Sequence, residues 1–259
     1  MLKKITNEIK SGFWGFINFI SFSLETFFKF ASFYKETNVS SLVLLRQILF
    51  TGYEALGLIL VLATALGGLL IGQFGSLLIN LGQSQLFFDI LVKAITCEIS
   101  SVLTAFLIVA RSGTAIATEI ANMKVNQEIE LIDSIGISPI SYLIIPRLVG
   151  VTVSCVVLTI YFNVATYIGG WLIANLMHPY PFSSFVYSLF KALTISDFAQ
   201  AILKSLVFGI LISLISSYQA FQVDKAITQV PQRTIKAVVY CISTIIVVDL
   251  LISVLFALF

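Results

Sequence analysis

The sequence predicts an all-α integral membrane protein with five transmembrane helices. Of its 259 residues, 58% are hydrophobic and only 11% are charged, and the mean hydropathy is +1.02. A soluble domain has about 25% charged residues, so this chain cannot cover a water-facing surface. The alternating segments of about ten residues that an outer-membrane barrel needs are missing. Helices are the expected spanning elements, because each satisfies its own backbone hydrogen bonds in lipid.

Residues 1–35 carry several lysines around a short apolar run that is rich in aromatic residues. The run from Ser11 to Leu24 is too short to cross a hydrocarbon core of roughly 30 Å. We expect a basic amphipathic helix that lies in the cytoplasmic interface. A cleaved signal peptide is the alternative, but bulky residues follow the run where a small-residue cleavage site would be needed.

Five apolar runs follow, and they predict transmembrane helices at residues 42–79, 86–109, 148–177, 198–220 and 237–259. In the first helix, Gly67, Gly68 and Gly72 let another helix approach closely or let this helix bend. The sequence shows no linker and no internal repeat, so residues 1–259 are expected to form a single domain.

Glu98 lies about ten residues from either end of the second apolar run, so we expect it well inside the bilayer. A carboxylate at that depth is costly and is a functional candidate that faces a cavity or the bundle interior. A protonated or hydrogen-bonded structural residue is the alternative. Lys204 and Asp249 are charged residues within the fourth and fifth runs.

Basic residues gather on one side of the predicted topology, while the net charge of +2 is too small to suggest a nucleic-acid partner. One side would hold Lys3, Lys4, Lys10, Lys29, Lys35, Arg46, Arg111, Lys124, Arg147, Lys225, Arg233 and Lys236. The opposite loops would hold only Lys191. Cytoplasmic loops accumulate lysine and arginine, which predicts a cytoplasmic amino terminus.

The longest polar interval runs from Ala110 to Arg147. Within it, the apolar residues Ile116, Ile120, Met123, Ile129, Ile132 and Ile135 alternate with charged residues at helical spacing. This pattern predicts an amphipathic helix outside the membrane. Such a helix either packs on its own bundle or docks into a groove on a cytoplasmic partner.

Several kinds of chemistry are missing from the sequence. No phosphate-binding Gly-x-x-x-x-Gly-Lys-Ser/Thr loop occurs, so the chain is not itself an ATPase. The patterns His-Glu-x-x-His, Cys-x-x-Cys and Gly-x-Ser-x-Gly do not occur either, and His178 is the single histidine. We therefore expect no enzymatic activity, no metal site, no catalytic residue and no cofactor.

The polar interval also carries a family signature. Its residues are Ala110-Arg111-Ser112-Gly113-Thr114-Ala115-Ile116-Ala117, Glu119-Ile120, Met123-Lys124-Val125, Ile129, Gly136, Pro139, Tyr142-Leu143 and Pro146-Arg147. With these residues the chain resembles the Mla-type (MlaE-like) permeases. They are membrane subunits of ABC transporters that move lipids between the inner and outer membranes of diderm bacteria, and related permeases occur in plastids.

The resemblance implies a homodimeric permease for phospholipid in a bacterial inner membrane, or in the inner envelope membrane of a plastid. A separate ABC ATPase would dock on a coupling helix at residues 119–135, and a periplasmic protein with mammalian-cell-entry domains would cover the outer face. The expected coupling residues are Arg111, Glu119, Met123, Lys124, Glu128, Ile129, Asp133 and Arg147. The expected substrate-cavity residues are Glu98, Cys97, Gly67, Gly68 and Gly72.

Two departures from the family pattern stand out. The usual Arg-Glu pair reads Cys97-Glu98, and residues 230–235 differ from the usual sequence before the fifth helix. Two other functions stay open from the sequence. One is a transporter driven by an ion gradient, with Glu98, Lys204 and Asp249 as a relay, and the other is a membrane scaffold that transports nothing.

Overall fold

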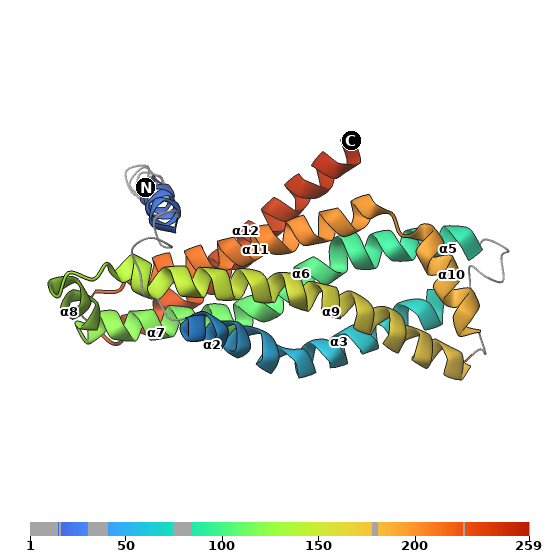
Figure 1. The fold of residues 1–259 in the computed structure, drawn as a ribbon, viewed down its shortest axis with the longest axis horizontal. Helices are drawn as coiled ribbons and strands as arrows, with labels where there is room; N and C mark the ends of the chain where they lie inside the picture. The colour runs from blue at the N-terminus through green and yellow to red at the C-terminus, as the bar shows by residue number, and fades with distance from the viewer. Residues whose placement is uncertain are drawn as a thin grey trace, which may run out of the picture.

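The chain folds into an elongated bundle of long helices in its computed structural model, which describes residues 15, 17–30, 41–74, 84–177, 181–224 and 226–258 (Figure 1). No strand occurs within these ranges. Five continuous helical stretches are long and apolar enough to cross a membrane: Val43–Gly72, Gln85–Val125, Ile140–Leu176, Ile195–Phe221 and Gln229–Leu258. The predicted class, an all-helical multi-pass membrane protein with five spans, is confirmed.

The first three spans combine α-helices with short 3-10 or π-helical segments. The first contains α2 (Ser41–Gly52), η1 (Tyr53–Ala55), α3 (Leu56–Leu69) and the π-helical η2 (Leu70–Phe74). The second contains α5 (Ser84–Val92), the π-helical η3 (Lys93–Ile99), α6 (Ser100–Ile108), the π-helical η4 (Val109–Gly113) and α7 (Thr114–Val125). After α8 (Glu128–Ser134), the third contains the π-helical η5 (Ile140–Ile144) and α9 (Ile145–Met177). α10 (Phe182–Ala192), α11 (Ile195–Phe221) and α12 (Gln229–Leu258) complete the chain.

The helix predicted at 119–135 is divided in two. α7 continues the second span as far as Val125, and α8 is a separate short helix at one end of the bundle (Figure 1). Between them Gln127 has φ of 61°, a left-handed conformation that an α-helix cannot contain. Gly136, with φ of +81°, follows α8 in a conformation that glycine adopts without strain.

The fifth helix begins eight residues earlier than the predicted start at residue 237. α12 begins at Gln229, and Pro231 lies in its first turn. Proline is tolerated there because the first backbone N–H groups of a helix have no intrahelical partner. Hydropathy detects only the part of a helix that lies in lipid. It therefore does not detect the polar first turns of α12.

α9 runs along the middle of the bundle, with α3 and α11 packed against it (Figure 1). Glycines permit both contacts. A Cβ at Gly67 would meet the carbonyl oxygen of Thr166 and lie 3.1 Å from the Cα of Gly170, and a Cβ at Gly209 of α11 would lie 2.6 Å from the Cα of Thr152. The predicted close approach to the glycines of the first span is therefore made by α9.

Part of the predicted interfacial segment 1–35 is helical, over residues 17–30, and residues 1–14, 16 and 31–35 lie outside the described residues. Phe19 packs edge-to-face on Tyr218 near the end of α11, with ring centroids 5.4 Å apart. Near the other end of the helix over residues 17–30, Lys29 donates a hydrogen bond to Ser138 Oγ over 3.0 Å. Residues 75–79, predicted to end the first span, also lie outside the described residues.

Candidate functional site

Three charged side chains meet within the membrane-spanning part of the bundle. Glu98 lies thirteen residues after Gln85, Lys204 lies nine residues after Ile195, and Asp249 lies nine residues before Leu258. Glu98 and Lys204 are therefore about 14–20 Å along their helices from the end of the bundle where α5 and α11 begin, and Asp249 lies about 14 Å before the end of α12, at a rise of about 1.5 Å per residue. We expect this level to lie within the hydrocarbon core, which is roughly 30 Å thick.

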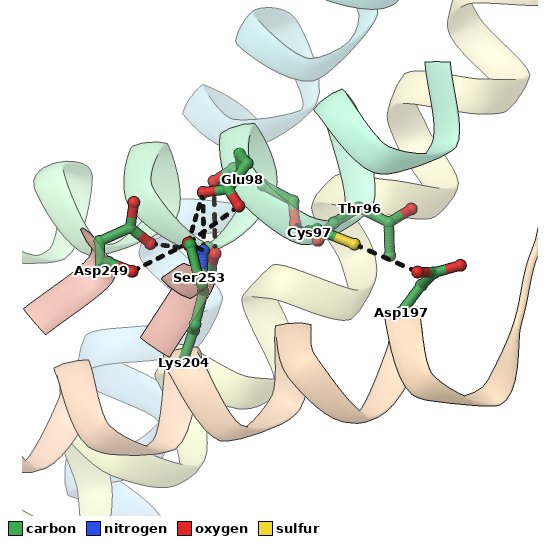
Figure 2. Close-up of polar contacts among 9 residues, drawn as sticks. Thr96, Cys97, Glu98, Asp197, Lys204, Asp249 and Ser253 are labelled. Carbon is green, nitrogen blue, oxygen red and sulfur yellow. Dashed lines mark hydrogen bonds and ion pairs between the residues drawn. The ribbon is translucent and has the colours of Figure 1, made fainter. Parts of the chain in front are cut away.

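Lys204 joins the three helices (Figure 2). Its Nζ lies 2.7 Å from Glu98 Oε2 and 2.7 Å from Asp249 Oδ1, and it donates to Ser253 Oγ over 2.7 Å. The Ser253 hydroxyl in turn lies 3.0 Å from Glu98 Oε1 and 2.9 Å from the carbonyl oxygen of Asp249, either of which can accept its proton. We call Glu98, Lys204, Asp249 and Ser253 the ion cluster.

The members of the ion cluster differ in exposure. The side chain of Lys204 is 0% exposed, that of Asp249 is 15% exposed and that of Glu98 is 42% exposed. An ammonium group has three N–H donors, and Lys204 has three oxygen neighbours at 2.7 Å. With both carboxylates ionised, the cluster has a formal charge of −1, and its accessible part belongs mainly to Glu98.

The widened helix η3 turns neighbouring side chains toward different partners. Cys97 is buried and its thiol lies 3.6 Å from Asp197 Oδ1, while Thr96 Oγ1 lies 2.6 Å from the hydroxyl of Tyr167 on α9. Figure 2 shows Cys97 pointing toward Asp197 and Glu98 pointing toward Lys204. π-helical turns often occur at functional sites, and this one holds a buried polar contact beside the ion cluster.

Asp197 also fixes the start of α11. It forms a reciprocal capping box with Thr194, whose backbone N–H donates to Asp197 Oδ2 over 3.0 Å. Such a box satisfies backbone donors that the first turn of a helix leaves unpaired. Asp197 therefore takes part both in the cap of α11 and in the contact of α11 with Cys97 of η3.

The structure distributes the five predicted cavity residues over four places. Glu98 belongs to the ion cluster, and Cys97 points to Asp197. Gly67 and Gly68 are buried against α9, and Gly72 is buried in η2. A role of these glycines and of Cys97 in a substrate cavity stays a prediction.

Four of the eight predicted coupling residues form ion pairs with other residues of the chain. Arg111 pairs with Glu54, and its guanidinium lies 5.9 Å from the centre of the Phe50 ring. Arg147 pairs with Glu119 over 2.8 Å, and Lys124 pairs with Glu130 over 2.8 Å. These pairs hold the first span, α7, α8 and α9 together at the end of the bundle where α8 lies.

The remaining coupling residues divide by burial. Ile129 is buried and Met123 packs against the core, whereas Glu128 and Asp133 are exposed. Beside them on α8, Leu131 is 65% exposed, and Ile135 just after α8 is equally exposed. The exposed surface of α8 therefore combines two large apolar side chains with acidic ones.

Sequence reasoning missed Ser253, Asp197 and Leu131. Ser253 lies four residues after Asp249, so helical spacing places both on one face of α12. Asp197 follows Thr194 at the spacing of a capping box. Leu131 is 65% exposed on α8, and no signal in the sequence distinguished it from the neighbouring apolar residues.

Within the described ranges, no group of three or more His, Cys, Asp and Glu residues could hold a metal ion. Cys97, Cys155 and Cys241 are buried free thiols. The ion cluster itself is built from ion pairs and hydrogen bonds.

Comparison with known proteins assigns the family. The profile of the family described as Permease MlaE matches residues 44–255, well over half of the chain. A protein named probable ABC transporter permease protein from Rickettsia typhi is 28% identical over 232 residues, which are 90% of this chain and 89% of the relative. The probable ABC transporter permease protein ycf63 of Pyropia yezoensis is 28% identical over 90% of this chain and 89% of its own.

A further relative is chloroplastic. It is the Arabidopsis thaliana protein named TRIGALACTOSYLDIACYLGLYCEROL 1, chloroplastic, which is 28% identical over 81% of this chain and 60% of its own length. An ABC permease is the membrane-spanning, non-catalytic component of its transporter and works with a separate ATPase. The chain belongs to the MlaE family of ABC transporter permeases.

Proposed function

We propose that this permease moves phospholipid between the inner and outer membranes of a two-membrane envelope, powered by its separate ATPase. The observation that carries the proposal is the ion cluster, in which the carboxylate of Glu98 is 42% exposed and belongs to a helix long and apolar enough to span a membrane. A lipid transporter needs a site for a polar headgroup inside the membrane, whereas a membrane scaffold does not. The chloroplastic relative, whose name contains that of a galactolipid, supports a lipid as cargo.

The exposure of Glu98 also supports a homodimer. A charged side chain in contact with hydrocarbon is costly, and intramembrane carboxylates face a bundle interior or a water-filled cavity. In the single chain, 42% of the Glu98 side chain has no cover. A second copy that packs over this face would enclose the headgroup site between two permeases.

The surface of α8 is the proposed docking site of the ATPase. Leu131 and Ile135 are exposed apolar anchors, and Glu128 and Asp133 supply a charged rim. A short helix with apolar anchors suits a groove on a partner protein. The excess of lysine and arginine on this side of the topology supports a cytoplasmic position for α8 and for the amino terminus.

The opposite end of the bundle would face the periplasm in a bacterial inner membrane, or the intermembrane space in the inner envelope membrane of a plastid. There α10 lies across the ends of the spans (Figure 1). We propose that a protein with mammalian-cell-entry domains covers this end and receives or delivers the lipid.

Glu98→Ala is expected to lower ATP-driven lipid transfer about tenfold, because it removes a charge-assisted hydrogen-bond acceptor from the headgroup site. The fold should survive, since Lys204 keeps Asp249 as its partner. The measurement is transfer of fluorescent phospholipid between vesicles by the reconstituted transporter. Asp89→Asn is the matched control, because Asp89 is a carboxylate of the same span that is hydrogen-bonded by Gln85 and lies outside the ion cluster. Wild-type transfer by Glu98→Ala would remove Glu98 from the mechanism.

Leu131→Asp is expected to weaken binding of the ATPase subunit about tenfold or more, because a central apolar anchor carries a large share of the binding energy at a protein interface. The measurement is the dissociation constant of the ATPase for the permease in nanodiscs. Leu131→Met keeps the anchor apolar and should bind normally. If both variants bind like the wild type, α8 is not the docking helix.

The other functions open from the sequence predict different results. A transporter driven by an ion gradient would move its cargo without ATP through Glu98, Lys204 and Asp249, whereas the chain belongs to an ABC family. A scaffold would tolerate Glu98→Ala and would still lose its complex with Leu131→Asp. ATP-dependent transfer that falls with Glu98→Ala while the ATPase stays bound separates the proposed function from both.

A further inference from the structure

The cation of the ion cluster is out of reach of any ligand. Lys204 is 0% exposed, and its Nζ has Glu98, Asp249 and Ser253 as oxygen neighbours, each 2.7 Å away. Two N–H donors of the ammonium group are hydrogen-bonded, to Glu98 and to Ser253, and Asp249 Oδ1 forms an ion pair with the same group. A phosphate that approached the cluster would find no donor on Lys204.

The hydroxyl of Ser253 is occupied in the same way. It accepts from Lys204 and has one proton, for which Glu98 and the carbonyl oxygen of Asp249 compete. The accessible atoms of the cluster are consequently carboxylate oxygens, chiefly those of Glu98. An ionised carboxylate only accepts hydrogen bonds, and the formal charge of −1 repels a further anion at close range in a medium of low dielectric constant.

We propose that the ion cluster selects lipids whose headgroup carries a hydrogen-bond donor, either a primary ammonium or a hydroxyl group, and discriminates against headgroups without one. This inference rests on the proposed function and names the headgroup chemistry that the same site accepts. A donor headgroup can bind a Glu98 oxygen that Lys204 leaves free, whereas a choline headgroup has no N–H or O–H to offer. A terminal phosphate monoester would meet the negative side of the cluster.

The test is lipid retention by the purified permease–ATPase complex. The complex is reconstituted in vesicles that contain equal amounts of phosphatidylethanolamine, phosphatidylglycerol, digalactosyldiacylglycerol, phosphatidylcholine and phosphatidic acid with identical acyl chains. It is then extracted in mild detergent, and the bound lipids are quantified by mass spectrometry. At pH 8 the phosphate monoester is mostly doubly ionised, so phosphatidic acid reports on phosphate recognition.

The expected result is that donor-bearing lipids are enriched about tenfold over phosphatidylcholine and phosphatidic acid, the effect of one hydrogen bond to a charged group. The ethanolamine lipid tests the ammonium source, and the glycerol and galactose lipids test the hydroxyl source. Glu98→Leu should bring the enrichment close to one while the complex stays assembled. Asp89→Asn should keep the wild-type ranking.

Two results would overturn the inference while leaving the proposed function intact. In the first, phosphatidylcholine is retained as well as phosphatidylethanolamine, so donors do not matter. In the second, phosphatidic acid ranks first and loses its rank in Lys93→Gln, so the exposed lysine at the start of η3 selects the headgroup instead. Failure to retain any lipid would overturn the proposed function itself.

Discussion

Lys204→Met is expected to destabilise the folded permease by about 3–5 kcal/mol, the cost of removing one partner from a buried ion pair. The substitution removes the cation that is paired with both Glu98 and Asp249. Two carboxylates would then be left within one cluster, within the bilayer. They would repel each other, and each would lose the group that compensates for its removal from water.

Thermal unfolding of the purified protein in detergent measures this loss. Neutralising the carboxylates as well, in Glu98→Gln/Lys204→Met/Asp249→Asn, should restore most of the stability, because no charge is then left without a partner. Lys191→Met on α10 is the control, since Lys191 is exposed. A Lys204→Met variant that unfolds at the wild-type temperature would show that the ion cluster contributes little to stability.

Gly67→Ala is expected to cost about 1–3 kcal/mol of stability, the range of overpacked cores, with the upper end favoured. The new methyl group would meet the carbonyl oxygen of Thr166 and the Cα of Gly170, both of them backbone atoms. A flexible side chain can rotate away from a methyl group, but backbone atoms move only if the whole of α9 shifts. Separation of α3 from α9 would also remove the contact of Gly170 with Gly67.

The matched control is Gly57→Ala in the same helix. A Cβ at Gly57 meets nothing within 4 Å, so this substitution should be neutral or stabilise by up to about 1 kcal/mol through helix propensity. Both variants are compared by thermal unfolding under the same detergent conditions. Equal unfolding temperatures for Gly67→Ala and the wild type would mean that α3 and α9 pack less closely than described.

The sequence predicted the spans well because hydropathy reports directly on contact with lipid. It predicted the carboxyl-terminal end of the second span poorly, since α7 continues as helix to Val125 beyond the apolar run. The break at Gln127 was also missed. Glutamine has no marked preference for a left-handed conformation, so its identity does not predict the break.

Glu98, Lys204 and Asp249 were each visible as charges in apolar runs, and the sequence grouped them only as a possible relay. Whether charges on three helices meet depends on the rotation and axial register of each helix, and residue spacing fixes neither between separate helices. The contact of Cys97 with Asp197 and the glycine contacts of α9 join these helices. Such contacts join distant segments and have no counterpart in local periodicity.

The second span has a mechanical consequence because it is one continuous rod of 41 residues, about 60 Å long. Glu98 lies eleven residues before η4, and Val125 lies twelve residues after it. If the helix pivots about η4, which the contact of Arg111 with Glu54 holds against the first span, the segments on the two sides of the pivot have nearly equal length. A displacement of Val125 would then move Glu98 in the opposite direction by a similar distance.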